Sequence, residues 1–147
     1  MDVRVQAAPF DIGAETSMFH ARQSGAGAIV TFTGVTRDVD GGLDAMEIEH
    51  YPAMTLPAME QFVTDAITRF KLLDALVIHR HGRMEPGDVI MMVATAATHR
   101  VAAFDAAEYL MDYLKSRAPF WKKEVTRRGA EWVEAKPEDE DLLSRWD

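Results

Sequence analysis

Residues 98–124 read THRVAAFDAAEYLMDYLKSRAPFWKKE, and this stretch decides most of the fold. Its apolar residues recur at the spacing of one helix face and predict a helix over about 99–116, with inward-facing Ala103, Ala106, Ala107, Leu110, Met111 and Leu114. Thr98 is the expected N-cap. Pro119 disfavours helical backbone in the residue before it, so the helix is expected to end near Arg117. A strand over 120–126 follows, and the many inward alanines indicate that the helix packs closely on a sheet.

Outward from this stretch, alternating or continuous apolar runs predict further strands at about 1–8, 25–33, 43–51, 74–81, 89–97 and 131–135. Helical spacing predicts helices over 12–23 and 55–70, capped by Asp11 and Thr55, and a short docked helix within 138–146. Residues 82–88 are expected to form a turn. Because paired strands lie between the helices, the predicted class is α+β, with a mixed or antiparallel sheet, three main helices and a small antiparallel hairpin region. One domain over residues 1–147 is expected.

The composition excludes several kinds of function. The chain has 147 residues, a net charge of −8 and no cysteine. It therefore has no disulfides, thiolate metal sites or cysteine nucleophiles. Net acidity argues against a protein that binds duplex nucleic acid, whose affinity depends on many Lys and Arg residues. No apolar run is long enough to span a membrane, and residues 1–10 lack a signal-peptide core, so a cytoplasmic protein is expected.

Positive charge gathers in one part of this acidic chain. Residues 115–128 contain a single acid, Glu124, and six basic residues: Lys115, Lys122, Lys123, Arg117, Arg127 and Arg128. Such a cationic region favours a small anionic ligand. A lysine beside Phe120 and Trp121 is expected to be partly dehydrated, which lowers its pKa and makes a neutral amine available. The alternative for Lys115 is simply a favourable interaction with the helix C-terminus.

Other candidate residues are isolated. His99 and Arg100 follow Thr98 at the predicted helix start, where backbone N–H groups favour anions, although capping alone also explains this tripeptide. Arg37 follows a strand and is by itself most often a surface residue. His79 and His81 share a strand face, but without a third ligand they favour core or surface histidines over a metal site. Nucleotide-binding and hydrolase motifs are absent.

Taken together, several segments resemble the large, catalytic subunit of molybdopterin synthase. The similarity runs in order along nearly the whole chain and is most specific in the segment that ends in LKSRAPFWKKE. The segments are VTFTGVTRD (30–38), EIEHYPAMT (47–55), VIHRHGRMEPGD (77–88), THRVAAFDAAEYLMDYLKSRAPFWKKE (98–124) and WVEAKPED (132–139).

The resemblance implies a hammerhead-type α+β fold and a homodimer in which each copy binds a small ubiquitin-like sulfur carrier, giving a heterotetramer. It also implies an enzyme, a sulfurtransferase without a bound cofactor or metal. The carrier's C-terminal Gly-Gly tail, activated as a thiocarboxylate, would supply two sulfurs to cyclic pyranopterin monophosphate, forming the dithiolene of molybdopterin. An enzyme that installs sulfur but has no cysteine must receive that sulfur from a partner, which agrees with this scheme.

The resemblance also implies the site residues, which are the residues of this sequence at the positions that match the family's motifs. Lys115 and Lys122 are the expected catalytic residues. The expected substrate-binding residues are Val35, Thr36, Arg37, His99, Arg100, Lys115, Lys122, Lys123 and Glu124. Some relatives have arginine where this chain has Lys136, so a two-pronged phosphate contact is not expected at that position. We further expect the residues around 37, 99–100 and 115–122 to line one cavity.

Two alternatives of other classes remain open at this point. The same basic region suits a non-catalytic dimeric module that binds a phosphorylated metabolite or a ubiquitin-like tail. Phe120 and Trp121, flanked by lysines, would also suit single-stranded RNA, which stacks its bases on aromatic side chains. The surrounding acidic surface argues against RNA.

Overall fold

The computed structural model describes residues 1–38 and 42–147. Its first sheet has the strand order β1 (Asp2–Gln6), β4 (Asp74–Arg80), β6 (Val89–Ala97), β2 (Ala28–Val35). β1 and β4 are parallel, and the other pairs are antiparallel. The second sheet is antiparallel throughout, in the order β5 (Gly82–Met84), β3 (Leu43–His50), β7 (Phe120–Thr126), β8 (Gly129–Trp132). The predicted α+β class is confirmed.

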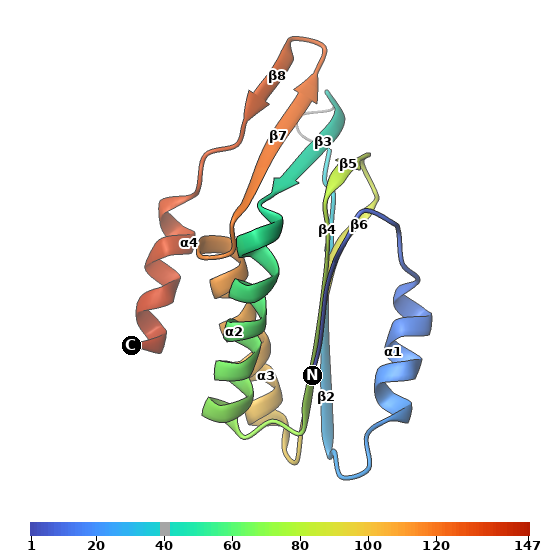
Figure 1. Cartoon of the computed structure of the whole chain (residues 1–147), viewed down its shortest axis with the longest axis vertical. Helices are drawn as coiled ribbons and strands as arrows, with labels where there is room; N and C mark the ends of the chain where they lie inside the picture. Colours follow the sequence, from blue (N-terminus) through green and yellow to red (C-terminus); the bar gives the residue numbers. More distant parts are fainter. Residues whose placement is uncertain (39–41) are drawn as a thin grey trace.

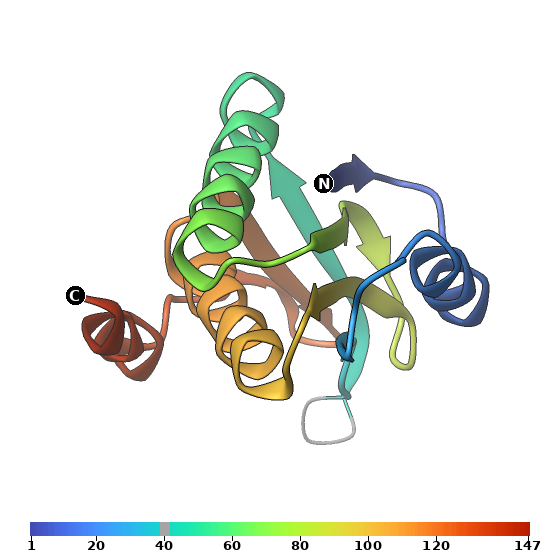
Figure 2. The same cartoon turned by 90° about the horizontal axis from the view of Figure 1, so that it is seen from below.

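Helices cover both faces of the first sheet. α1 (Ile12–Ala21) lies on one face, and α2 (Pro52–Phe70) and α3 (Arg100–Ser116) lie side by side on the other (Figures 1 and 2). The short helix α4 (Pro137–Leu142) and a final 3₁₀ turn (Leu143–Trp146) pack against the outer side of α3. No helix in the described residues has the length and apolar character needed to cross a membrane.

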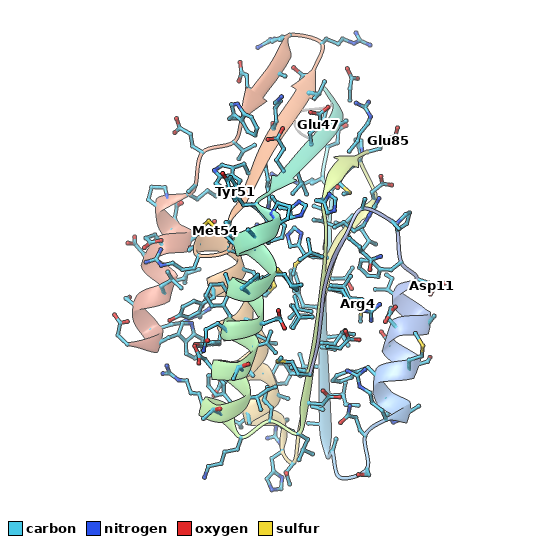
Figure 3. The ribbon with its side chains drawn as sticks, viewed as in Figure 1. Arg4, Asp11, Glu47, Tyr51, Met54 and Glu85 are labelled. Carbon is cyan, nitrogen blue, oxygen red and sulfur yellow. The ribbon has the colours of Figure 1, made fainter. Side chains whose placement is uncertain are left out.

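The main core fills the space between the first sheet and the helices α2 and α3 (Figure 3). Successive residues of β4 point to opposite faces, and every residue of this strand is buried because both faces are covered. Ala103 and Ala106 of α3 are fully buried, as predicted for close packing, and Thr95 Oγ1 of β6 donates a hydrogen bond of 2.7 Å to the Ala103 carbonyl. A second, smaller core lies under α1 around Phe19, Leu76, Ile78 and Met92.

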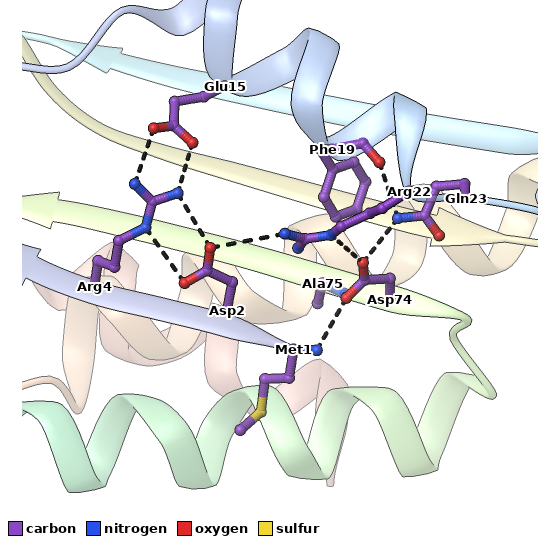
Figure 4. A network of polar contacts seen from close by, with 9 residues as sticks. All are labelled: Met1, Asp2, Arg4, Glu15, Phe19, Arg22, Gln23, Asp74 and Ala75. Carbon is purple, nitrogen blue, oxygen red and sulfur yellow. Dashed lines mark hydrogen bonds and ion pairs between the residues drawn. The ribbon is translucent and has the colours of Figure 1, made fainter.

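A polar network fixes α1 and the first strand to the sheet (Figure 4). Asp74, at the start of β4, accepts hydrogen bonds from Arg22 (2.7 Å) and Gln23 (2.8 Å) and pairs with the Met1 ammonium at 3.0 Å. Burial opposes ionisation of Asp74, but these contacts prevail and lower its pKa to about 2. The paired carboxylate therefore stays charged across the neutral range and holds both segments in place.

Three local predictions are wrong. α2 begins at Pro52, three residues before the expected cap, because proline suits the first helical position. Thr55 instead accepts the Tyr51 N–H at 3.1 Å and donates to the Pro119 carbonyl at 3.0 Å. The residue that caps α3 is His99 and not Thr98, and no side chain completes the cap. Residues 82–84 of the predicted turn form the additional strand β5.

Candidate active site

A short segment that contains Pro119 connects the end of α3 to β7 (Phe120–Thr126), the strand that carries Lys122 and Lys123. The Arg117 N–H donates to the Tyr113 carbonyl (2.7 Å) and closes the helix, as predicted from Pro119. The chain then enters β7 at Phe120, with Pro119 held by the Thr55 hydroxyl. Lys115 consequently lies exposed in the last turn of α3, close to the start of β7.

Lys122 occupies the inner face of the second sheet. It lies opposite Ile48 of β3 and is half-buried. Burial lowers its pKa to about 8, the positive charges of Lys115 and Lys136 act in the same direction, and Asp139 acts against them. The Val133 N–H donates to the Lys122 carbonyl (2.7 Å) and brings the segment that leads to Lys136 alongside β7. We call Lys115, Lys122 and Lys136 the lysine cluster.

Aromatic and imidazole rings pack behind the lysine cluster. His79 of β4 stacks on Phe120 with ring centroids 3.8 Å apart and an interplanar angle of 16°. His50 contacts His81, with centroids 4.1 Å apart, and lies 6.5 Å from the Phe120 ring. Burial and the neighbouring His50 lower the pKa of His81. No cluster of metal-binding side chains occurs in residues 1–38 and 42–147.

The loop after β2 is fixed by its backbone. The Thr36 N–H donates to the Asp88 carbonyl, and the Gly87 N–H donates to the Thr36 carbonyl, both at 2.8 Å. The Thr36 side chain is 2% exposed, and its hydroxyl has no hydrogen-bond partner among the described residues. Val35 and Arg37 are exposed. Of these three predicted substrate-binding residues, only Val35 and Arg37 therefore have side chains that are accessible from solvent.

Arg37 and the lysine cluster lie at the same end of the molecule. Val35 pairs with Val89 at the start of β6, so Arg37 lies beyond that end of the first sheet. α3 runs back along the sheet from the far end of β6, which brings Lys115 toward the end where Arg37 lies (Figure 1).

His99 and Arg100 lie at the opposite end. They follow β6 directly and are exposed at the start of α3. Arg100 and Lys115 are separated along the helix by about 22 Å at 1.5 Å per residue. The expectation of one cavity around 37, 99–100 and 115–122 is therefore wrong for a single chain, because a helix cannot bring its two ends together.

Lys123 and Glu124 point to opposite faces of β7. Lys123 shares the outer face with Trp132, its amine lying 4.9 Å from the ring centroid and 3.9 Å from a Glu47 carboxylate oxygen. Glu124 pairs with Met46 and shares the inner face with Lys122. The structure therefore groups Glu124, and not Lys123, with the lysine cluster.

An apolar groove that the sequence did not reveal lies between β2 and α3. Its volume is about 380 Å³, and it is lined by Val30, Thr31, Phe32, Phe104, Ala107, Glu108, Met111, Asp112 and Arg145. Met111 precedes Lys115 by one helical turn, so the Met111 end of the groove and Lys115 lie on the same face of α3. Phe104 is 57% exposed on a helix whose inward positions are filled by other residues. An aromatic residue at an outward position of the predicted helix was therefore the signal in the sequence for this groove.

Comparison with known proteins gives consistent results. A family model described as MoaE protein matches residues 5–117. The chain is 64% identical over 146 residues to the molybdopterin synthase catalytic subunit of Cereibacter sphaeroides, an alignment that covers 99% of this chain and 100% of the relative. The solved structure of the molybdopterin biosynthesis MoaE protein from Burkholderia ambifaria matches with a TM-score of 0.85 and 46% identity over 99% of this chain and 97% of that one.

A more distant structure shares the fold. It is the complex of subunits 1 and 2 of molybdopterin-converting factor from Helicobacter pylori, matched with a TM-score of 0.73 and 19% identity over 92% of this chain and 90% of that one.

Proposed function

Because the chain belongs to the MoaE protein family, we propose that it is the catalytic subunit of a molybdopterin synthase. In this proposal it transfers sulfur from the C-terminal thiocarboxylate of a small ubiquitin-like carrier subunit to cyclic pyranopterin monophosphate. Two successive oxygen-to-sulfur exchanges give the dithiolene, and each spent carrier tail leaves as a carboxylate. The observation that carries the proposal is the lysine cluster, which combines an exposed cation with a partly dehydrated amine.

The two lysines suit different parts of this chemistry. Lys115 is exposed and close enough to Lys122 for its charge to lower the pKa of that amine. We assign Lys115 to stabilising the acyl intermediate or transferring protons as sulfur leaves the carrier. With a pKa of about 8, Lys122 remains mostly protonated at pH 7 and exchanges its proton readily. It is assigned to neutralising negative charge that develops near the pterin.

The apolar groove between β2 and α3 suits the carrier's tail. A Gly-Gly segment is slender and extended, and the groove passes Met111 one turn before Lys115. A tail lying there would present its terminal acyl group to the lysine cluster. The cationic surroundings also attract the anionic thiocarboxylate.

Phosphate binding in this proposal requires a second copy of the chain. Arg37 lies at the same end as the lysine cluster, but His99 and Arg100 lie at the other end of α3. If all of them contact one pterin, His99 and Arg100 must come from the partner in a homodimer. We therefore propose a dimer with two composite sites, each served by one carrier, giving a heterotetramer.

The test is a reconstituted reaction with thiocarboxylated carrier and pterin precursor, followed by mass spectrometry of the pterin. Wild-type protein should produce the mass gain of two oxygen-to-sulfur exchanges. Lys115→Ala should lower turnover by about 100-fold or more while carrier binding is kept. Arg128→Ala, which removes an exposed cation at the β7–β8 turn, is the matched control and should retain normal turnover.

Two outcomes would contradict the proposal. Near-normal product formation by Lys115→Ala would remove the assigned role of that lysine. Binding of carrier and pterin to wild-type protein without any mass gain would instead support the non-catalytic binding module.

A further inference from the structure

His79 is a buried imidazole to which the proposed reaction gives no role. It lies in β4, near the corner where this strand leaves the first sheet, and is 5% exposed. Its Nδ1 lies 2.7 Å from the Arg80 carbonyl oxygen, so the ring donates a hydrogen bond from that nitrogen. Burial lowers the pKa of His79 to about 3, and the ring is therefore uncharged near neutral pH.

The flat face of His79 covers Phe120 in nearly parallel stacking at 3.8 Å. Phe120 and Lys122 lie on the same face of β7, because alternate residues of a strand point the same way. Phe120 therefore precedes Lys122 as the neighbouring side chain along that face of β7. The start of β7 therefore packs against the first sheet through His79.

We propose that His79 is a positioning residue for Lys122. Its buried ring holds Phe120, and through Phe120 the first residues of the strand β7, so that the Lys122 amine remains beside Lys115 with little access to water. This inference rests on the proposed function for its catalytic meaning. The physical effect on Lys122 can be measured without substrate.

The choice of imidazole has a chemical reason. Phenylalanine would stack equally well but would leave the Arg80 carbonyl without its donor. A positively charged side chain would be opposed by burial and by the positive charges of Lys122 and Lys115. A neutral imidazole satisfies the carbonyl and still presents an apolar face to Phe120.

Other charged groups surround this site, among them Glu124 on the same face of β7 as Lys122. The charges of Lys122, Lys115 and His81 lower the pKa of His79. The charges of Lys115 and Lys136 lower the pKa of Lys122, and the charge of Asp139 raises it. A variant that changes only the ring at position 79 leaves these groups in place. Any change in the titration midpoint of Lys122 therefore reports on the exposure of its amine to water.

The experiment is an NMR titration of Lys122 in the full-length protein after reductive ¹³C-methylation of its lysines, with Lys122→Arg used to assign the signal. His79→Ala should raise the Lys122 midpoint by about 1 unit or more, because water then enters beside the amine. His79→Phe, which keeps the stacked ring, should leave the midpoint within about 0.5 unit of wild type. His20→Ala, on exposed α1, is the matched control and should change nothing.

The proposal is overturned if His79→Ala folds, as judged by its melting transition, and Lys122 titrates as in wild type. If His79→Ala does not fold, Phe120→Leu provides the same test from the other partner of the stack. Phe120→Leu should raise the midpoint, and an unchanged midpoint would also overturn the proposal. Absence of sulfur transfer in the reconstituted assay would contradict the proposed function but leave the titration result intact.

Discussion

Arg100 and Lys115 lie at opposite ends of the same helix, separated by about 22 Å along its axis. Resemblance assigns both residues to one substrate, although neither chain folding nor side-chain length can join them within one copy. Because of this separation, the two residues can contact one substrate only if they come from two copies of the chain. It can be tested with pairs of variants.

Mixing two inactive variants should restore activity. In a mixed dimer of Arg100→Ala and Lys115→Ala, one composite site carries both substitutions and the other carries neither. Random exchange between equal amounts should therefore give about a quarter of the wild-type activity. The assay is product formation after mixing, with each variant alone as the control. A mixture as inactive as its components would show that the two residues do not meet across a dimer.

Replacing Lys122 by methionine should stabilise the protein near neutral pH. The folded chain holds this amine at a pKa of about 8, below its value of 10.5 in the unfolded chain. Between these values the amine binds more protons in the unfolded chain, so the contribution of Lys122 to wild-type stability rises as the pH increases from 8 to 10.5. At pH 7 the amine is protonated in both the folded and the unfolded chain, so the full free-energy cost of burying its charge applies. Lys122→Met should then be more stable by about 1 to 2 kcal/mol, an amount reduced by the solvent that still reaches the amine.

Urea unfolding at pH 7, 8, 9 and 10 measures this effect. The advantage of Lys122→Met over wild type should shrink as the pH approaches 10.5. Lys122→Arg is the control, because arginine stays protonated throughout and retains the penalty. A methionine variant that is less stable than wild type at pH 7 would show that the buried charge is well compensated.

Gly27 should not tolerate a side chain. A Cβ at this position would lie 2.1 Å from the Thr98 carbonyl oxygen, which belongs to the junction between β6 and α3. Backbone must move to relieve that overlap, so Gly27→Ala should lower the free energy of unfolding by about 1 to 3 kcal/mol. Gly25→Ala is the matched control. Its Cβ would meet only Leu73 at 3.9 Å, and its effect should stay within about 0.5 kcal/mol. Equal stability of the two variants would contradict this prediction.

Local signals in the sequence predicted the parts of the fold that depend on neighbouring residues. The end of α3 and the start of β7 follow from Pro119, and both were placed within one residue. The inner face of β7 follows from simple alternation. The partial dehydration of Lys122 was predicted from its aromatic neighbours and agrees with its lowered pKa.

Features that depend on distant contacts were not predicted. The strand β5 pairs with β3 across more than thirty residues of sequence, whereas its local sequence predicts a turn. The stacking of His79 on Phe120 joins two sheets, and no local pattern encodes it. The groove beside Phe104 and the separation of Arg100 from Lys115 arise from how α3 is laid on the first sheet.

The pairing of β3 with β7 has a consequence for biosynthesis. His50 pairs with Phe120, so the surroundings of Lys122 form only after most of the chain has left the ribosome. Pairing between such distant segments is slow because a long loop must close first. The first sheet, by contrast, is complete at Ala97. All four strands of the first sheet are therefore synthesised before β7, and the Lys122 amine stays exposed to water until β7 pairs with β3.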